Sequence, residues 1–127
     1  TPPRVHAETV NLSVMQRHEA DPVPAPFSFL HDRVWIRPED QVPCYMTFTT
    51  PVVDAIVRET LQHNRHVMEE VTGVRYCPSI ESKVLRFGGR SHQVWLEPEG
   101  LHSMLLYPQG LSCTMPPADQ LRLMRSI

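Results

Sequence analysis

Cys77 is the residue of this chain best suited to covalent chemistry. It precedes Pro78 in the run 73–87, and three cations share that run: Arg75, Lys83 and Arg86. Proline pushes the residue before it into an extended conformation, so Cys77 is expected at a turn or strand end, ahead of a segment that could be helical. Nearby cations, or the positive end of a following helix, lower a thiol pKa. The pattern indicates a reactive thiol or, as the alternative, a small buried side chain beside solvated cations.

The carboxylates of the chain allow more than one role. We interpret Glu81 as an ion-pair partner of Lys83 or Arg86, a kind of pair that contributes little when exposed. Glu97 and Glu99 stand two residues apart, so on an extended chain they point the same way. They could act as a general base, bind a cation, or simply lie in a solvated turn.

The other cysteines and the histidines predict no metal centre. The three cysteines lie far apart and form no Cys-x-x-Cys pair, which favours reduced thiols in an intracellular compartment. Cys44 follows Pro43 in a strand-like run and is expected to be a buried structural thiol, whereas Cys113 receives no role. His63 and His66 suit a metal pair on a helix face, but no third ligand has matching spacing, so a solvated face is expected.

Composition limits the class of protein. The 127 residues are enough for one domain with a core, and no apolar stretch is long enough to span a membrane. A net charge of -2 and a pI near 6.3 give no overall attraction to nucleic acid, so any RNA contact needs a local basic patch. The chain has 13 prolines and 5 glycines, and it lacks the Gly-x-Gly-x-x-Gly fingerprint of dinucleotide-binding domains.

Hydrophobic periodicity predicts both strands and helices. Strands are expected in five segments: 8–15, 33–37, 44–50, 91–96 and 111–115. Residues 16–31 should form a surface loop whose end is anchored by Phe27 and Phe29. One helix should begin at Thr50-Pro51 and run to about residue 64, and another should run from Pro117 through residue 124. The mixture has no βαβ regularity, so the fold class is α+β: a mixed or antiparallel sheet with two or three helices.

Several motifs, in one order along the chain, resemble the GidA/MnmG family of FAD-dependent tRNA uridine 5-carboxymethylaminomethyl modification enzymes. The matching segments are 1–4, 26–29, 42–45, 73–87, 92–100 and 107–110. Val74, Phe48 and Thr50 depart from the family pattern. Residues 34–40 and 92–95 resemble the mitochondrial branch more than the bacterial one.

The resemblance implies that residues 1–127 are an internal fragment of a larger protein. They would be the middle, insertion portion of a two-domain FAD-binding flavoprotein, without its N-terminal dinucleotide-binding half and its C-terminal helical domain. The implied activity installs a 5-carboxymethylaminomethyl-type group, in mitochondria a 5-taurinomethyl group, on the wobble uridine of tRNA. The implied cofactors are FAD, bound mainly by the missing part, and a folate one-carbon donor.

The resemblance also implies partners and a location. The partners are tRNA, a GTPase of the MnmE type and a second copy of the full-length protein. The location is the mitochondrion, or the cytoplasm if the protein is bacterial. The departures from the family pattern leave room for an alternative, a non-catalytic interaction module derived from the same fold, but retention of Cys77, Lys83 and Glu81 favours the enzyme.

The family's site residues carry over to this chain at matching positions only. Cys77 matches the family's cysteine and would be the catalytic thiol. Four residues would contact the flavin: Thr1, Pro2, Tyr107 and Gln109. Three cations would contact tRNA or flavin phosphates: Arg75, Lys83 and Arg86. No metal site is implied.

Overall fold

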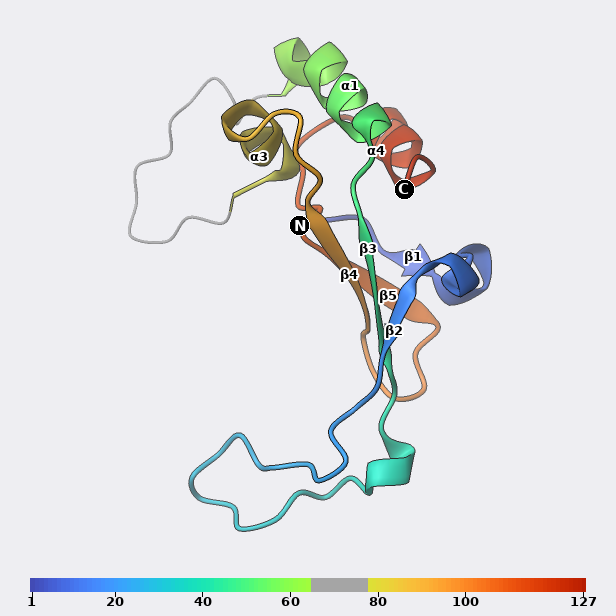
Figure 1. Cartoon of the computed structure of the whole chain (residues 1–127), viewed down its shortest axis with the longest axis vertical. Helices are drawn as coiled ribbons and strands as arrows, with labels where there is room; N and C mark the ends of the chain where they lie inside the picture. The colour runs from blue at the N-terminus through green and yellow to red at the C-terminus, as the bar shows by residue number, and fades with distance from the viewer. Residues whose placement is uncertain (65–77) are drawn as a thin grey trace.

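The computed structural model describes residues 1–64 and 78–127, and these contain a five-stranded antiparallel sheet in the order β1-β5-β4-β3-β2 (Figure 1). The strands are β1 (Val5–His6), β2 (Gln16–His18), β3 (Cys44–Phe48), β4 (Gln93–Pro98) and β5 (Leu105–Gln109). The fold is therefore α+β with an antiparallel sheet, as the sequence predicts.

The central strand β4 separates two kinds of side chain. Val94 and Leu96 are buried on one face, with exposed fractions of 1% and 5%, while Trp95 and Glu97 alternate with them on the other face. The register continues this alternation across the sheet, because Trp95 lies opposite both Met46 and Gln109. One face therefore meets the core and the other carries polar and aromatic groups.

Three helices form within the described residues: α1 (Pro51–Thr60), α3 (Ile80–Arg86) and α4 (Pro117–Met124). Helices α1 and α4 both start with proline at the first position, where its missing N–H costs nothing. Thr50 is extended, as a cap should be, but its hydroxyl donates to the Ser126 carbonyl oxygen at 2.9 Å instead of capping α1. After α1 the chain continues as a 3-10 turn, Leu61–His63, close to the predicted helix end.

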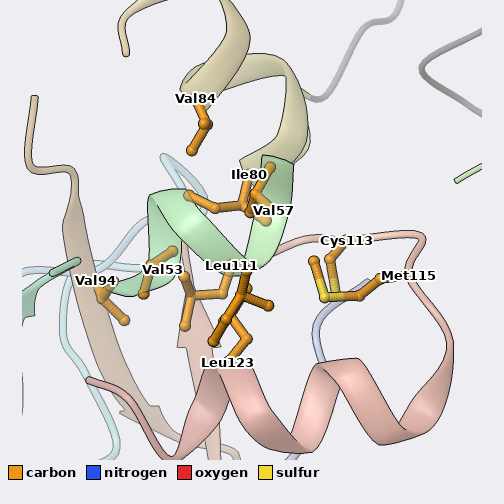
Figure 2. Close-up of a cluster of buried hydrophobic side chains, with 10 residues drawn as sticks. Val53, Val57, Ile80, Val84, Val94, Leu111, Cys113, Met115 and Leu123 are labelled. Atoms are coloured by element: carbon orange, nitrogen blue, oxygen red, sulfur yellow. The ribbon is translucent and has the colours of Figure 1, made fainter. Parts of the chain in front are cut away.

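The hydrophobic core lies where the three helices meet at one end of the sheet (Figures 1 and 2). Val53, Val57 and Ile80 are completely buried there, and each such side chain contributes roughly 1.5–3 kcal/mol before entropy is counted. The segment 111–115, predicted as a strand, has no strand structure, although Leu111, Cys113 and Met115 fill the core (Figure 2). Its apolar alternation therefore reflects burial between helices, and the strand prediction is wrong.

The N-terminal strand prediction is also wrong. Residues 8–15 form two 3-10 turns, Ala7–Thr9 and Leu12–Val14, instead of a half-buried strand. The Asn11 side chain accepts a hydrogen bond from the Ser13 N–H at 3.3 Å, and such a local bond competes with strand pairing. After β1, strand pairing resumes only at Gln16, where β2 takes the first residues of the predicted loop.

The long connection between β2 and β3 extends from the end of the sheet opposite the helices (Figure 1). Phe27 and Phe29 have exposed fractions of 107% and 106%, so they do not anchor the loop to the described part of the fold. Residues 33–37 form no strand, and a 3-10 turn follows at Pro38–Asp40. None of the helices in the described ranges is long and apolar enough to cross a membrane.

Candidate functional site

Helix α3 positions the part of the cysteine-containing run that the structure describes. Its cap, Ser79, accepts a hydrogen bond from the Ser82 N–H at 3.3 Å, and the Ile80 N–H donates to the Ser112 carbonyl oxygen at 2.7 Å. Cys77 and Arg75 lie outside the described residues, so the predicted thiol is located only by its place in the sequence. It precedes Pro78, which leads directly into this capped helix.

Glu81 is buried, contrary to its interpretation as a surface ion-pair partner. Its exposed fraction is 0%, and its Oε1 accepts hydrogen bonds from the Thr114 N–H at 2.8 Å and the Thr114 hydroxyl at 3.2 Å. The Asn64 side-chain amide, also buried, donates to the same oxygen at 3.4 Å. Glu81 therefore joins α3 to the segment after β5 and to the end of the α1 region. The ion pair was the wrong choice because the sequence does not show which helix face is covered.

Lys83 contacts the turn that ends β5. Its Nζ donates to the Gly110 carbonyl oxygen at 3.1 Å, 27 residues away in the sequence. Gly110 has φ +102, and a Cβ there would lie 2.7 Å from the Gln93 carbonyl oxygen, so this turn requires glycine. Lys83 is thus half-buried against the fold, whereas Arg86 and Arg90 are exposed beyond it.

These contacts bring two separate motifs together. Residues from Ile80 to Lys83 bind carbonyl and amide groups of residues 110–114, a segment that begins at the last residue of the Tyr107–Gly110 motif. The sequence predicts site residues in both motifs, and the structure makes them neighbours. Arg86 is held on the same short helix, while Arg75 cannot be placed.

Arg4 brings the N-terminal segment to β5. Its guanidinium Nη1 donates to the Pro2 carbonyl oxygen at 3.0 Å, its Cζ lies 4.3 Å from the centre of the Tyr107 ring, and it forms an ion pair with Glu99. Since β1 pairs with β5, Pro2 and Tyr107, both predicted flavin contacts, lie around one cation. Sequence reasoning left Arg4 out of the site, although it belongs to the Thr-Pro-Pro-Arg segment that carries the resemblance.

The described residues do not fit a complete FAD molecule. Pyrophosphate needs free N–H groups or a free cation, but Arg4 is already held by Glu99, and no glycine-rich turn opens a helix among the described elements. Thr1 is exposed and Pro2 is buried beside this cluster. The cluster could therefore supply at most one wall of a flavin site.

A pocket of about 410 Å³ lies on the polar face of the sheet. Six of its lining residues carry polar, thiol or aromatic groups: His18, Glu19, Cys44, Trp95, Glu97 and Gln109. We call it the sheet pocket. It extends across β2, β3, β4 and β5, because the cross-strand register aligns these side chains on one face. Sequence reasoning named Gln109 and Glu97 but missed Trp95 and His18, which only the register brings together.

Hydrogen bonding and burial define the chemistry of the sheet pocket. With its amide nitrogen turned towards Glu97, Gln109 donates to both carboxylate oxygens, at 3.1 Å for Oε2. The His18 and Trp95 rings lie 4.6 Å apart, tilted by 59°. Burial, and secondly the Glu97 charge, raises the pKa of the Cys44 thiol, so this cysteine stays protonated. Glu97 and Glu99 have different partners, Gln109 and Arg4.

Neither described cysteine has the properties of a nucleophile. Burial, followed by the Glu81 charge, raises the pKa of Cys113 to about 11, and its side chain packs in the core (Figure 2). In the parts of the chain that the structure covers, no three His, Cys, Asp or Glu residues are grouped to hold a metal ion. His66, half of the histidine pair considered above, lies outside those parts.

Comparison with known proteins places this geometry in context. A family model described as "Glucose inhibited division protein A" matches residues 1–127. The mitochondrial 5-taurinomethyluridine-[tRNA] synthase subunit MTO1 of Mus musculus is 63% identical over 91% of this chain and 17% of its own length. The tRNA uridine 5-carboxymethylaminomethyl modification enzyme MnmG of Caldicellulosiruptor saccharolyticus is 42% identical over 100% of this chain and 20% of its own length.

A solved structure supports the same comparison. The GidA protein of Aquifex aeolicus, in its form I crystal, superposes with a TM-score of 0.82 at 35% identity, over 99% of this chain and 22% of that one. The chain therefore spans about a fifth of the length of the relatives it matches.

Proposed function

The chain belongs to the GidA/MnmG family, and on that premise we propose that it is the middle portion of an FAD-dependent enzyme that modifies the wobble uridine of tRNA. The modification is a 5-carboxymethylaminomethyl-type group, with taurine as the amine in the mitochondrial form. The higher identity to the mitochondrial relative, 63% against 42%, supports a mitochondrial location. A folate one-carbon donor, a GTPase partner of the MnmE type and a homodimer belong to the same proposal.

One observation carries the proposal. The helix that follows Cys77 is fixed to residues 110–114 by the Ile80, Glu81 and Lys83 contacts, in a chain that matches the family from end to end. Two motifs of the family signature thus form one structural unit, with the Arg4 cluster at the other end of β5. Because an interaction module of the same fold would also need these contacts, what favours the enzyme is that Cys77 is retained in the segment leading into the helix that they hold.

Cys77 would supply the nucleophile. C5 of uracil reacts poorly with electrophiles, and addition of a thiolate at C6 makes C5 enolate-like and therefore nucleophilic. FAD, when bound by the complete protein, supplies redox chemistry for the one-carbon unit. The residues of this chain would hold the thiol segment, through α3, and contribute a wall to the flavin site through Pro2 and Tyr107, with Thr1 and Gln109 as further contacts.

We predict that the chain alone does not bind FAD, whereas the full-length protein purifies with flavin absorbance. The described residues provide no helix N-terminus for the pyrophosphate, and the Arg4 guanidinium is occupied by Glu99. Titration of FAD into the purified chain, followed by flavin fluorescence, tests the first part. Saturable micromolar binding to the chain would place the nucleotide site here, and a colourless full-length protein would contradict a flavoenzyme.

Two exposed cations, one at the end of α3 and one just after it, are expected to contact tRNA phosphates. Arg86, the last residue of α3, and Arg90 are both exposed, and the double variant Arg86→Ala/Arg90→Ala leaves the contact between Lys83 and Gly110 in place. Removing two phosphate contacts should weaken tRNA binding by the full-length protein and reduce the log–log salt slope by about one to two units. The measurement is tRNA affinity across a salt series, with flavin content checked first.

The matched control removes two cations elsewhere. Arg17 lies on β2 and Arg37 lies in the long loop at the other end of the sheet (Figure 1). The variant Arg17→Ala/Arg37→Ala has the same charge change and should leave the salt slope unaltered. Equal slopes for the wild type and both double variants would show that Arg86 and Arg90 serve only the fold.

A further inference from the structure

The sheet pocket has the size of a small-molecule site and is not needed for the core. Its volume of about 410 Å³ falls in the range of ligand pockets, and it opens to solvent on the face of the sheet away from the helices. Ala20 and Val42 add apolar walls to the aromatic wall formed by Trp95. Such a mixture of apolar walls with a few fixed polar groups is typical of a binding site rather than of a packing defect.

The charge of the sheet pocket selects against anions. Two carboxylates, Glu19 and Glu97, line it. Glu19 is paired with Arg17 at 2.9 Å, so Glu97 supplies most of the negative charge, and no lysine or arginine is among the described lining residues. The Cys44 thiol adds no positive charge and remains protonated, as shown above. A phosphate or a nucleic-acid backbone would meet repulsion here, whereas a cation would be attracted.

The Trp95 ring and the Glu97 carboxylate would both attract a positively charged group of a ligand. A cation is attracted to the face of an indole ring, and His18, 4.6 Å from Trp95, packs against that ring and limits its movement. Gln109 holds the Glu97 carboxylate through both oxygens, so the acceptor is already oriented before a ligand arrives. Lone pairs of both oxygens remain for N–H donors of a bound cation.

We propose that the sheet pocket binds the ammonium group of a small primary amine, with Glu97 as the principal acceptor and Trp95 as the aromatic wall. This inference rests on the proposed function in one respect, because that reaction consumes an amine and so requires a site for one. An acid group on the same molecule must face the solvent at the mouth, since no cation lines the pocket. Specificity therefore lies in the amine end of the ligand.

Three probe molecules separate the amine from the acid group. Ethylamine carries the ammonium alone, taurine carries an ammonium and a sulfonate, and 2-hydroxyethanesulfonate replaces the amine of taurine with a hydroxyl. Dissociation constants are measured on the full-length protein by saturation-transfer difference NMR. We expect ethylamine to bind at least as tightly as taurine, and 2-hydroxyethanesulfonate to bind at least tenfold more weakly than either.

The residue test uses a change of charge with little change of shape. Glu97→Gln should weaken binding of ethylamine and taurine at least tenfold, whereas the control Glu8→Gln, at an exposed carboxylate near the N-terminus, should leave it unchanged. If Glu97→Gln fails to fold, as judged by flavin content and thermal midpoint, Glu19→Gln tests the second carboxylate, with an expected loss of about threefold.

Two results would overturn the inference: binding of 2-hydroxyethanesulfonate as tight as that of taurine, or unchanged amine binding in the folded Glu97 or Glu19 variant. Neither result bears on the proposed function, which is measured separately by flavin absorbance and by modified nucleoside in tRNA. Conversely, amine binding that persists in a protein without flavin or tRNA activity would refute the proposed function alone.

Discussion

Replacement of Cys77 by serine should abolish wobble-uridine modification by the full-length protein. Serine preserves the size of the side chain but is a far weaker nucleophile at neutral pH, so the addition at C6 should fail. Loss of a covalent nucleophile commonly costs a factor of about a thousand or more in turnover, and we expect a loss of at least that size. The measurement is mass spectrometry of tRNA nucleosides after incubation with the variant.

A second cysteine variant distinguishes lost chemistry from lost structure. Cys113 is buried in the core with a pKa raised to about 11, so Cys113→Ala should lower stability modestly while keeping activity per folded molecule. Alanine is the better control than serine, because a serine hydroxyl at this apolar position would need a partner. Near-normal modified nucleoside from Cys77→Ser, with flavin and folding intact, would remove Cys77 from the mechanism.

The elements predicted correctly are those whose local signals and tertiary burial agree. The Thr50-Pro51 start and the apolar spacing of Val53, Ile56 and Val57 predict α1, and the structure buries all three side chains. The alternation of β4 likewise places Val94 and Leu96 in the interior. Both signals depend only on neighbouring residues, so a single sequence is sufficient to find them.

The elements predicted wrongly are those where distant contacts decide. The apolar run 111–115 alternates like a strand but lies among helices that the sequence does not place. No element was predicted at β5, and its proline is tolerated because β1 pairs only with Leu105 and Leu106, which leaves Pro108 near an edge. The apolar loop residues Phe27 and Phe29 were expected to bury themselves, but the described fold offers them no surface.

Prediction of the candidate site from the sequence is limited in the same way, by contacts between residues that are distant in the chain. The family motifs pointed to two separate segments, and the structure shows that α3 and residues 110–114 are neighbours. The roles of the individual residues of α3 depend on which face of the helix is buried. That face is determined by contacts with Thr114 and Asn64, which lie far from α3 in the sequence. For that reason Glu81 was assigned to the surface, whereas it is buried, and the contact of Lys83 with Gly110 was not foreseen.

Glu81→Ala should destabilise the fold strongly. The substitution removes the acceptor for the Thr114 N–H, the Thr114 hydroxyl and the Asn64 amide, in a place where Glu81 has an exposed fraction of 0% and Asn64 of 1%. Each buried donor left without a partner costs about 1–3 kcal/mol, so the free energy of unfolding should fall by roughly 3 kcal/mol or more. Urea denaturation of the chain, followed by tryptophan fluorescence, measures the change.

Two further variants show that the acceptor at this buried position is responsible. Glu81→Gln keeps an oxygen for the Thr114 N–H and should cost about 1 kcal/mol, because its new NH₂ group must replace Oε2, which has no partner among the described residues. Glu59→Gln alters an exposed carboxylate that pairs with Arg122 and should leave the midpoint unchanged. If Glu81→Ala unfolded at the wild-type midpoint, the stability of α3 would not depend on its contact with Thr114. The Ile80 and Lys83 contacts alone would then hold α3 against residues 110–114.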